Sequence, residues 1–283
     1  MSGAAAVGIV AQRNNERAHE LAAALTESLE GEFDVTVAVD ELTGDAIDVA
    51  GIPVAEMADR DFVVSIGGDG TLLFVAREVG STPIVGVNLG EVGFLNAVPP
   101  DDAPAVITDL AARLQETGSL EAEARELVRL RATGRGSDWT LEPALNEIGV
   151  HGPRRGPGGG ATIEVRVDGK RYVESHADGV LVATPTGSTA YNLSEGGPLL
   201  RPDTDSLVVT QMAATDAMPS LVVDTDSEVT LSISEADVAY AISDGRNRQR
   251  LEPPATVSVS LADDPVRLVG PEADFFDGLE KLD

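Results

Sequence analysis

Five residues at positions 67–71, Gly-Gly-Asp-Gly-Thr, have types and an order that suit the chemistry of phosphate groups. They follow a short apolar run at 62–66, typical of a buried parallel strand, and lead into a helical pattern at 71–79. Glycines allow a sharp turn and the close approach of a ligand, and a helix start presents N–H groups to phosphate. A carboxylate among phosphates repels them unless it holds a cation or accepts a proton. Asp69 is therefore either a functional acid or the cap of the following helix.

A second segment combines an acid, a buried strand and a dense set of hydroxyl groups. Asp178 precedes the apolar run at 179–183, four hydroxyl side chains lie between Thr184 and Thr189, and Tyr191 follows. Hydroxyls and exposed N–H groups after a strand can bind ribose, amide and phosphate groups together. The alternative is a turn with a helix cap, which favours the same residue types.

A third candidate is the pair Asn146-Glu147. A carboxylate can accept hydrogen bonds from two adjacent ribose hydroxyls, and an amide both donates and accepts. The alternative is a surface strand. His151 is expected at a strand end and Arg246 in a hairpin turn.

The elements that must position the first segment alternate between strands and helices. Strand patterns occur at 4–11, 33–39, 62–66 and 83–87, with helical patterns between them and at 101–116. This alternation predicts an α/β domain with a mostly parallel sheet, in which ligands bind at the carboxyl ends of the strands. The Gly-Gly-Asp-Gly-Thr segment and the segment after the fourth strand both occupy such ends.

After Gly118 the pattern changes to short strands separated by turn signals, which predicts a β-rich second domain. The expected strands are 126–132, 144–150, 162–167, 179–183, 207–210, 228–233, 238–242 and 257–261. Asp-Gly pairs at 168–169 and 244–245 favour hairpin turns.

The last residues, from 274 onward, have the pattern of a short amphipathic helix whose phenylalanines require burial. We therefore expect three parts: an α/β domain at 1–117, a β-rich domain at 118–265, and a C-terminal segment at 266–283 that returns to the first domain.

The composition limits the partners and the compartment. The 283 residues carry a net charge of −28, typical of proteins that stay soluble in concentrated salt. This charge argues against nucleic acid and anionic membranes as general partners. The absence of cysteine excludes disulfides, thiolate catalysis and zinc–thiolate sites. With no signal-peptide pattern and no long apolar run, we expect a cytoplasmic protein.

Taken together, the motifs resemble the NAD kinase family, the enzymes that phosphorylate NAD to NADP. The matching segments, in family order, are 67–71, Val-Asn-Leu-Gly at 87–90, Gly-Phe-Leu at 93–95, Asn146-Glu147, Asp-Gly at 178–179, Thr-Pro-Thr-Gly-Ser-Thr-Ala-Tyr-Asn at 184–192 and Gly-Gly-Pro at 196–198. The first motif is shared with diacylglycerol, sphingosine and phosphofructo-kinases. The run at 184–191 with the preceding Asp-Gly is highly specific.

The resemblance implies that NAD binds between a Rossmann-like domain and a β-rich domain. It also implies that Asp69 is the general base on the 2′-hydroxyl of the adenosine ribose, although Asp69 could instead hold Mg²⁺. The donor, ATP or inorganic polyphosphate, would bring the Mg²⁺, and no metal site made by the protein alone is expected. Family members are commonly homodimers or homotetramers.

The residues expected to contact the nucleotides are Gly68, Asp69, Gly70, Asn146, Glu147, His176, Asp178, Thr186, Thr189, Ala190, Tyr191, Ser194 and Ala213. Two alternatives remain open. One is a lipid or sugar kinase that uses only the first motif, and the other is a sensor that binds NAD(P) without catalysis.

Overall fold

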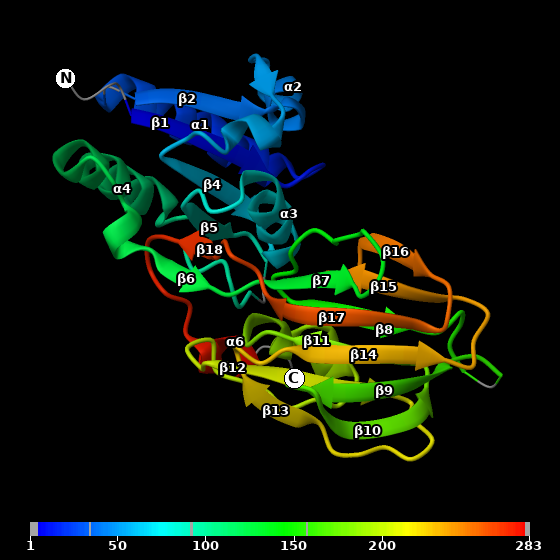
Figure 1. Ribbon diagram of the computed structural model, residues 1–283. Coiled ribbons are helices and arrows are strands. Elements are labelled where there is room, and N and C mark those ends of the chain that lie inside the picture. The colour runs from blue at the N-terminus through cyan, green and yellow to red at the C-terminus, as the bar shows by residue number, and fades with distance from the viewer. Residues whose placement is uncertain (1–4, 34, 91–92, 157, 281–283) are drawn as a thin grey trace. The chain divides into compact units, whose positions relative to one another are not determined.

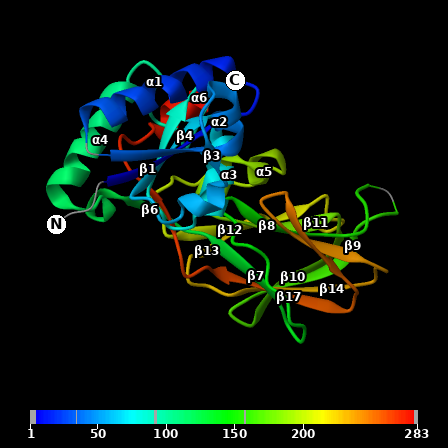
Figure 2. The ribbon, with the colours of Figure 1, turned by 90° about the horizontal axis from the view of Figure 1, so that it is seen from above.

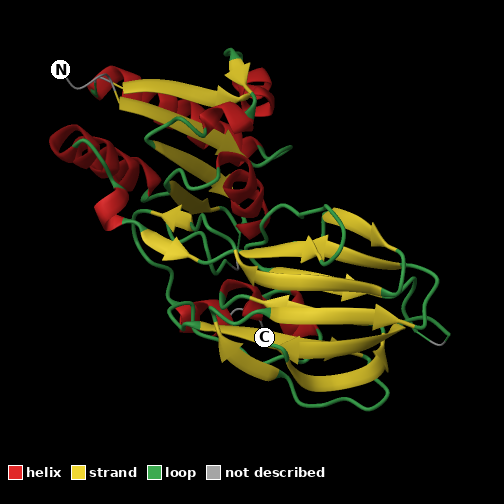
Figure 3. Cartoon of the chain, in the orientation of Figure 1, coloured by secondary structure: helices red, strands yellow, loops and turns green. Residues whose placement is uncertain are grey.

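A computed structural model describes residues 5–33, 35–90, 93–156 and 158–280 of the chain (Figure 1). The chain forms two compact units, one made of Met1–Leu127 with Pro265–Asp283 and the other of Val128–Asp264. The longer helices belong to the first unit, and the second is made mainly of strands, as the colours of Figure 3 show. The predicted fold class, a Rossmann-like α/β domain with a parallel sheet and a β-rich domain, is confirmed.

The first unit is built on a seven-stranded sheet with the order β3-β2-β1-β4-β5-β18-β6. Neighbouring strands are parallel except for β6, which is antiparallel to β18. The chain builds outward from β1 through β2 and β3, and then continues on the other side of β1 with β4. Such a reversal between two parallel strands is where open α/β sheets bind ligands, at the carboxyl ends of the strands.

The elements of this unit are β1 (Ala5–Ala11), α1 (Glu16–Glu32), β2 (Val35–Asp40), α2 (Glu41–Ile47), β3 (Gly51–Ile52), the 3-10 turn η1 (Val54–Met57), β4 (Phe62–Gly67), α3 (Asp69–Val79), β5 (Ile84–Asn88), α4 (Ala103–Thr117), η2 (Glu121–Glu123), β6 (Arg125–Leu127), β18 (Val266–Leu268) and α6 (Phe275–Glu280).

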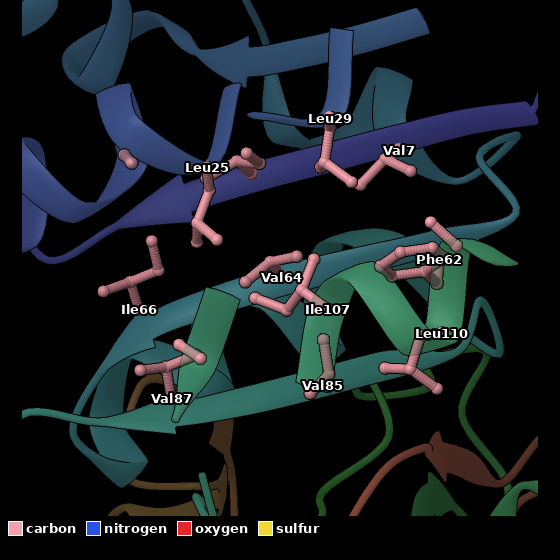
Figure 4. Close-up of a cluster of buried hydrophobic side chains, with 14 of the residues drawn as sticks. Val7, Leu25, Leu29, Phe62, Val64, Ile66, Val85, Val87, Ile107 and Leu110 are labelled. Carbon is pink, nitrogen blue, oxygen red and sulfur yellow. The ribbon is translucent and has the colours of Figure 1, made fainter. Parts of the chain in front are cut away.

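Helices cover both faces of this sheet, so its central strands are apolar along their whole length. On one face, Leu25 and Leu29 of α1 and Ile107 and Leu110 of α4 pack against side chains of β1, β4 and β5 (Figure 4). Helix α3 lies on the opposite face (Figure 2), together with η1. All six residues of β4 are buried, which fixes the residue that follows the strand at a defined point of the sheet edge.

The second unit is a sandwich of two antiparallel sheets, with the orders β10-β9-β14-β17-β7 and β13-β12-β11-β8-β15-β16. Apolar side chains that alternate along the strands of both sheets form its core. Its elements are β7 (Leu130–Gly134), β8 (Glu147–His151), β9 (Ala161–Val167), β10 (Lys170–Ala177), β11 (Gly179–Ala183), η3 (Thr186–Thr189), α5 (Tyr191–Ser194), β12 (Ser206–Met212), β13 (Leu221–Asp224), β14 (Val229–Ser234), β15 (Ala239–Ser243), β16 (Asn247–Leu251) and β17 (Ala255–Leu261).

One predicted strand differs in the structure, whereas the predicted hairpin turns are confirmed. The strand expected at 126–132 is two strands, β6 in the first unit and β7 in the second, because the chain leaves one sheet for the other within this continuous apolar pattern. The Asp-Gly pairs at 168–169 and 244–245 do form hairpin turns, and all four residues have positive φ, as a type I′ turn requires. Among the described residues, no helix is both long and apolar enough to cross a membrane.

Candidate functional site

Asp69 is the first residue of α3, directly beyond the buried strand β4. Its carboxylate accepts four hydrogen bonds. Oδ2 accepts the Phe94 N–H at 2.9 Å, and Oδ1 accepts the N–H groups of Leu95 at 3.3 Å and Asn96 at 3.4 Å and the Asn96 side-chain amide at 3.0 Å. Because each carboxylate oxygen accepts about two hydrogen bonds, Oδ2 retains acceptor capacity while Oδ1 is saturated. The N-cap residue of α3 is Gly68, and no side chain caps the helix. The alternative that Asp69 is only a helix cap is therefore wrong.

Asn96 completes the support of Asp69, although no sequence motif identifies this residue. The side chain is 2% exposed and lies against Gly86 of β5, where a Cβ would stand only 2.3 Å from the Asn96 Oδ1. Gly93 lies close on the other side, since a Cβ there would be 3.3 Å from the Asp69 Oδ1. These two glycines let the loop and its amide reach the carboxylate.

The glycines of the motif divide into two roles. Gly67 ends β4 in close contact with α3, because a Cβ there would lie 2.5 Å from the Thr71 hydroxyl. Gly68 and Gly70 have no neighbouring heavy atoms within 4 Å of the position a Cβ would take, and neither has a positive φ. Both glycines therefore border open space next to Asp69 in the chain, and the lack of a Cβ leaves the backbone free for the close approach of a ligand.

The segment after β5 curls back to the first motif. Leu89 donates its N–H to the Gly67 carbonyl at 3.1 Å, and Gly90 donates to the Asn88 side-chain oxygen at 2.9 Å. Leu95 is buried, as an anchor of the loop must be. Two residues of the expected 88–95 segment, at 91 and 92, lie outside the described residues.

In the second unit the Asn146-Glu147 pair and the hydroxyl-rich run come together. Strands β8 and β11 are antiparallel neighbours, with Glu147 opposite Ala183. Thr184 donates its N–H to the Asn146 carbonyl at 2.9 Å, and a Cβ on Gly187 would stand only 2.0 Å from the same oxygen. The turn η3 therefore packs directly on Asn146, and only glycine permits this contact.

The hydroxyl groups of this run serve two different purposes. Thr184 and Ser188 are fully buried and bond to the backbone: Thr184 to the Leu145 carbonyl at 2.5 Å, and Ser188 to Leu200. Thr186 and Thr189 are only partly buried. The Thr189 hydroxyl also donates to the Thr186 carbonyl, at 3.2 Å, so three of the four hydroxyls hold the turn in shape, and the two partly buried ones are the candidates for a ligand contact.

Glu147 is a buried acid with an unsatisfied oxygen. It is 6% exposed, and within the described part of the chain its Oε2 has no hydrogen-bond partner. Burial, with a smaller contribution from the negative charge of Asp244, raises the pKa of Glu147 to about 8. The side chain is therefore neutral at pH 7 and can donate a hydrogen bond as well as accept one.

Asp244, which the sequence identified only as a turn residue, holds the start of β8. Its carboxylate accepts the N–H groups of Leu145 and Asn146, each at 2.8 Å, and of Glu147 at 3.1 Å. Its own N–H donates to the Glu147 carbonyl at 3.1 Å. Asp244 therefore fixes the backbone on which both predicted binding residues are carried.

A pocket of about 330 Å³ opens beside Glu147 in the second unit. It is lined by Glu147, Gly149, His151, Gly152, Pro153, Arg154, Arg155, Leu181, Tyr191, Tyr240, Ile242, Gly245 and Arg248. The His151 and Tyr191 rings are stacked, with centroids 6.2 Å apart, and the Arg155 guanidinium lies 5.0 Å from the Tyr191 centroid. Arg248 lies over Tyr240 at 4.2 Å. The pocket thus combines flat aromatic surfaces with positive charge, in a chain whose net charge is −28.

His151 ends β8, as expected, but it also forms part of this pocket. Burial, assisted by the positive charge of Arg155 and opposed by Asp178, lowers the pKa of His151 to about 4. The ring is therefore neutral at pH 7 and suited to stacking on Tyr191.

Of the remaining predicted residues, Ala190 precedes and Ser194 ends the short helix α5, whereas His176, Asp178 and Ala213 lie at the other end of β11. Asp178 precedes this strand and accepts the Gly156 N–H at 2.9 Å, while its own N–H donates to Met212, the neighbour of Ala213. His176 contacts the Gly159 carbonyl at 2.8 Å and lines a different pocket of about 590 Å³. Of the residues expected in the second unit, only Glu147 and Tyr191 line the 330 Å³ pocket. No group of three His, Asp or Glu side chains suited to a metal ion occurs among the described residues.

The chain matches two family models. The ATP-NAD kinase N-terminal domain matches residues 7–114, and the ATP-NAD kinase C-terminal domain matches residues 145–270. A protein from Haloarcula marismortui named NAD kinase is 52% identical over 98% of this chain and 99% of its own length. Another from Halobacterium salinarum is 51% identical over the same shares, and one from Methanosarcina acetivorans is 35% identical over 83% of each chain.

Solved structures have the same fold. A crystal structure of yeast NADH kinase complexed with NADH matches with a TM-score of 0.85 and 22% identity, covering 98% of this chain and 87% of the other. An NAD kinase from Archaeoglobus fulgidus in complex with ATP matches with a TM-score of 0.73 and 23% identity, covering 98% of both chains. At this identity the two structures establish the fold.

Proposed function

The chain belongs to the NAD kinase family, and from this premise we propose that Asp69 is the general base that activates the 2′-hydroxyl of the adenosine ribose of NAD. The observation that carries this proposal is the state of the Asp69 carboxylate. Four N–H groups hold it at the end of β4, Oδ2 still has acceptor capacity, and the neighbouring Gly68 and Gly70 border open space.

The chemistry required of Asp69 is modest. A sugar hydroxyl is a poor nucleophile, and phosphoryl transfer depends mainly on positioning and on neutralising charge. The Oδ2 atom accepts the hydroxyl hydrogen bond, orients the attacking oxygen, and takes its proton as the bond to phosphorus forms. Such general-base assistance contributes roughly 10²–10⁴-fold to the rate.

We further propose that the second unit binds the dinucleotide. The residues assigned to it are Asn146, Glu147, His176, Asp178, Thr186, Thr189, Ala190, Tyr191, Ser194 and Ala213. Support comes from the packing of η3 on Asn146, the partly buried hydroxyls of Thr186 and Thr189, and the neutral acid Glu147 in a pocket with aromatic walls. The guanidinium groups of Arg155 and Arg248 suit a ligand that bears phosphate.

The phosphoryl donor, ATP or inorganic polyphosphate, is proposed to carry Mg²⁺ with it. Mg²⁺ is usually bound by substrate phosphates and one or two carboxylates, so the chain needs no metal cage of its own. Asp69 is the acid that fits such a contact. When present, the ion would offset the negative charge of the transferred phosphoryl group. We also propose that the enzyme acts in the cytoplasm as a homodimer or homotetramer.

The direct test is to incubate the purified protein in molar KCl with NAD, Mg²⁺ and either ATP or polyphosphate, and to measure NADP. We expect NADP with at least one donor, and no phosphorylation of an NAD analogue that lacks the adenosine 2′-hydroxyl. Binding of NAD without product from either donor would favour the sensor. Phosphorylation of a lipid or free sugar in place of NAD would favour a lipid or sugar kinase.

The charge of −28 predicts that stability depends on salt. Salt screens the repulsion between acidic groups, and this screening weakens as the ionic strength falls. We expect the melting temperature to rise by at least about 5 °C between roughly 0.1 M and 2 M KCl, equivalent to roughly 1–2 kcal/mol. A thermal melt monitored by circular dichroism measures this, and an unchanged melting temperature would refute it.

A further inference from the structure

The C-terminal helix α6 contacts the loop that holds Asp69. Gly278 is buried in this helix, and a Cβ at its position would lie 2.7 Å from Cε1 and 2.8 Å from Cδ1 of the Phe94 ring. The Phe275 ring contacts the same side chain, with centroids 6.0 Å apart at an interplanar angle of 51°. The Phe94 ring is thus held by two residues from near the other end of the chain, both in the first unit.

Phe94 connects this contact to the carboxylate. Its backbone N–H donates to the Asp69 Oδ2 at 2.9 Å, and in the described part of the chain this is the only hydrogen bond that the oxygen accepts. The Oδ1 atom, by contrast, accepts three N–H groups from Leu95 and Asn96. A shift of Phe94 would therefore release the oxygen assigned to the proton transfer while Oδ1 stayed bound.

We propose that α6 is a positioning element for catalysis: by packing Gly278 and Phe275 against Phe94, it fixes the direction of the Asp69 Oδ2. This proposal rests on the base role of Asp69 proposed above. Neither Gly278 nor Phe275 touches Asp69 itself, so both act through Phe94.

The residue type at 278 supports this assignment. Glycine inside a helix is unfavourable relative to alanine by about 1 kcal/mol, so Gly278 lowers the intrinsic stability of α6. The short distance to the Phe94 ring requires glycine at this position, since any Cβ would have to displace the ring. The helix thus gives up intrinsic stability for a close contact with the loop.

The test is Gly278→Ala in the full-length protein, with three measurements: kcat, the dissociation constant of NAD, and amide hydrogen exchange at residues 94–96. We expect kcat to fall by roughly 10-fold, the effect of losing one hydrogen bond to a charged group. The NAD dissociation constant should stay within about twofold, and exchange of the Phe94 amide should accelerate.

A matched control is Gly31→Ala in α1, where a Cβ would meet nothing within 4 Å. This substitution gives the same change in helix propensity without a clash, so kcat and exchange at 94–96 should stay as in the wild type. A second variant, Phe275→Leu, weakens the packing on Phe94 without adding atoms, and it should lower kcat in the same direction by a smaller factor.

The outcomes separate this proposal from the base role. Unchanged kcat and unchanged exchange in Gly278→Ala would overturn it, as would an equal loss in Gly31→Ala. If exchange at 94–96 accelerates but Asp69→Asn retains full activity, the base role fails, whereas the holding of the loop by α6 stands.

Discussion

Each of the two units contains an acid that we propose to act on the nucleotides, and the two acids have opposite surroundings. Asp69 lies at the end of a buried parallel strand and receives four N–H donors. Glu147 lies at the start of an antiparallel strand, is almost fully buried, and has an oxygen without a partner among the described residues. N–H donors stabilise a carboxylate, whereas burial beside another acid favours the neutral form. The environment, more than the residue type, therefore distinguishes an acid whose carboxylate is held by hydrogen bonds from an acid that burial keeps neutral at pH 7.

The difference also shows how each acid is positioned. Asp69 is held directly, by hydrogen bonds to its own side chain. Glu147 is held through its backbone, because Asp244 accepts the N–H groups of residues 145–147, whereas the Glu147 Oε2 has no hydrogen-bond partner in the described part of the chain. Four substitutions can break or sharpen this comparison.

The largest expected effect is on Asp69. Asp69→Asn removes the proton acceptor but preserves the shape of the side chain, so kcat should fall roughly 10²–10⁴-fold. NAD binding, measured by calorimetry in molar KCl, should change little. A loss of binding that equals the loss of rate would mean that Asp69 serves only to bind.

The next largest effect is expected for Asp244→Asn. An amide at this position would direct its NH₂ group toward backbone N–H donors, which we expect to cost roughly 1–3 kcal/mol of unfolding free energy and to weaken NAD binding. Asp168→Asn is the matched control, because Asp168 occupies the same kind of turn with positive φ and accepts one N–H, from Glu228. Equal loss of NAD affinity in both variants would contradict the positioning role of Asp244.

Asn96 tests whether donors to Oδ1 matter. Asn96→Ala removes one donor to a charged acceptor, worth roughly 1.5–3 kcal/mol, so kcat should fall by about 10-fold or more. Asn96→Asp keeps the side-chain volume but places an acceptor beside Asp69, and it should be worse than Ala. If the Asp variant were more active than the Ala variant, packing against Gly86 would explain the role of Asn96.

The smallest effect concerns the proton on Glu147. The folded protein keeps this proton up to about pH 8, whereas an unperturbed Glu loses it near 4.5, so unfolding free energy falls as pH rises between these values. Titration of His151 raises the unfolding free energy with pH between about pH 4 and 6.5. Above pH 6.5 this opposing contribution of His151 ends, and the decrease due to Glu147 can be measured. Between pH 6.5 and 8 we expect a fall of roughly 1–2 kcal/mol.

Glu147→Gln should remove this slope, because the amide does not titrate. Unfolding measured at several pH values in constant salt tests it. A wild-type stability that rises between pH 6.5 and 8 would contradict the neutral state of Glu147.

Much of the fold could be predicted because apolar periodicity reports burial. The strands that the sequence did not identify in the second unit, β10, β13 and β16, are all edge strands of their sheets. An edge strand buries fewer side chains, and β16, with the sequence Asn-Arg-Gln-Arg-Leu, has almost no apolar signal. In the first unit β18 has three residues, too few for a pattern, yet it lies inside the sheet.

Residues of the candidate site could be predicted where they belong to a short sequence motif. They could not be predicted where their role depends on contacts with residues that are distant in the sequence. Asp69 was identified from its neighbours in sequence, but its donors at 94–96 and the contact of Gly278 with Phe94 depend on tertiary packing. The sequence identified Asp244 only as a turn residue, because the turn is formed by neighbouring residues. The three N–H groups that its carboxylate accepts belong to residues 145–147, which are distant in the sequence. Nothing in the sequence around Arg155 and Arg248, apart from their charge, predicted that they line the pocket.

The central claim, that Asp69 takes the proton of the ribose hydroxyl, is tested most directly by the pH dependence of kcat in the wild type and in Asp69→Asn, with saturating Mg²⁺. We predict that the wild type loses activity toward acidic pH as the base is protonated, and that the residual activity of the variant lacks this acidic limb. A variant that keeps the same acidic limb, and recovers its rate at higher Mg²⁺ concentration, would contradict the base role and assign Asp69 to the metal.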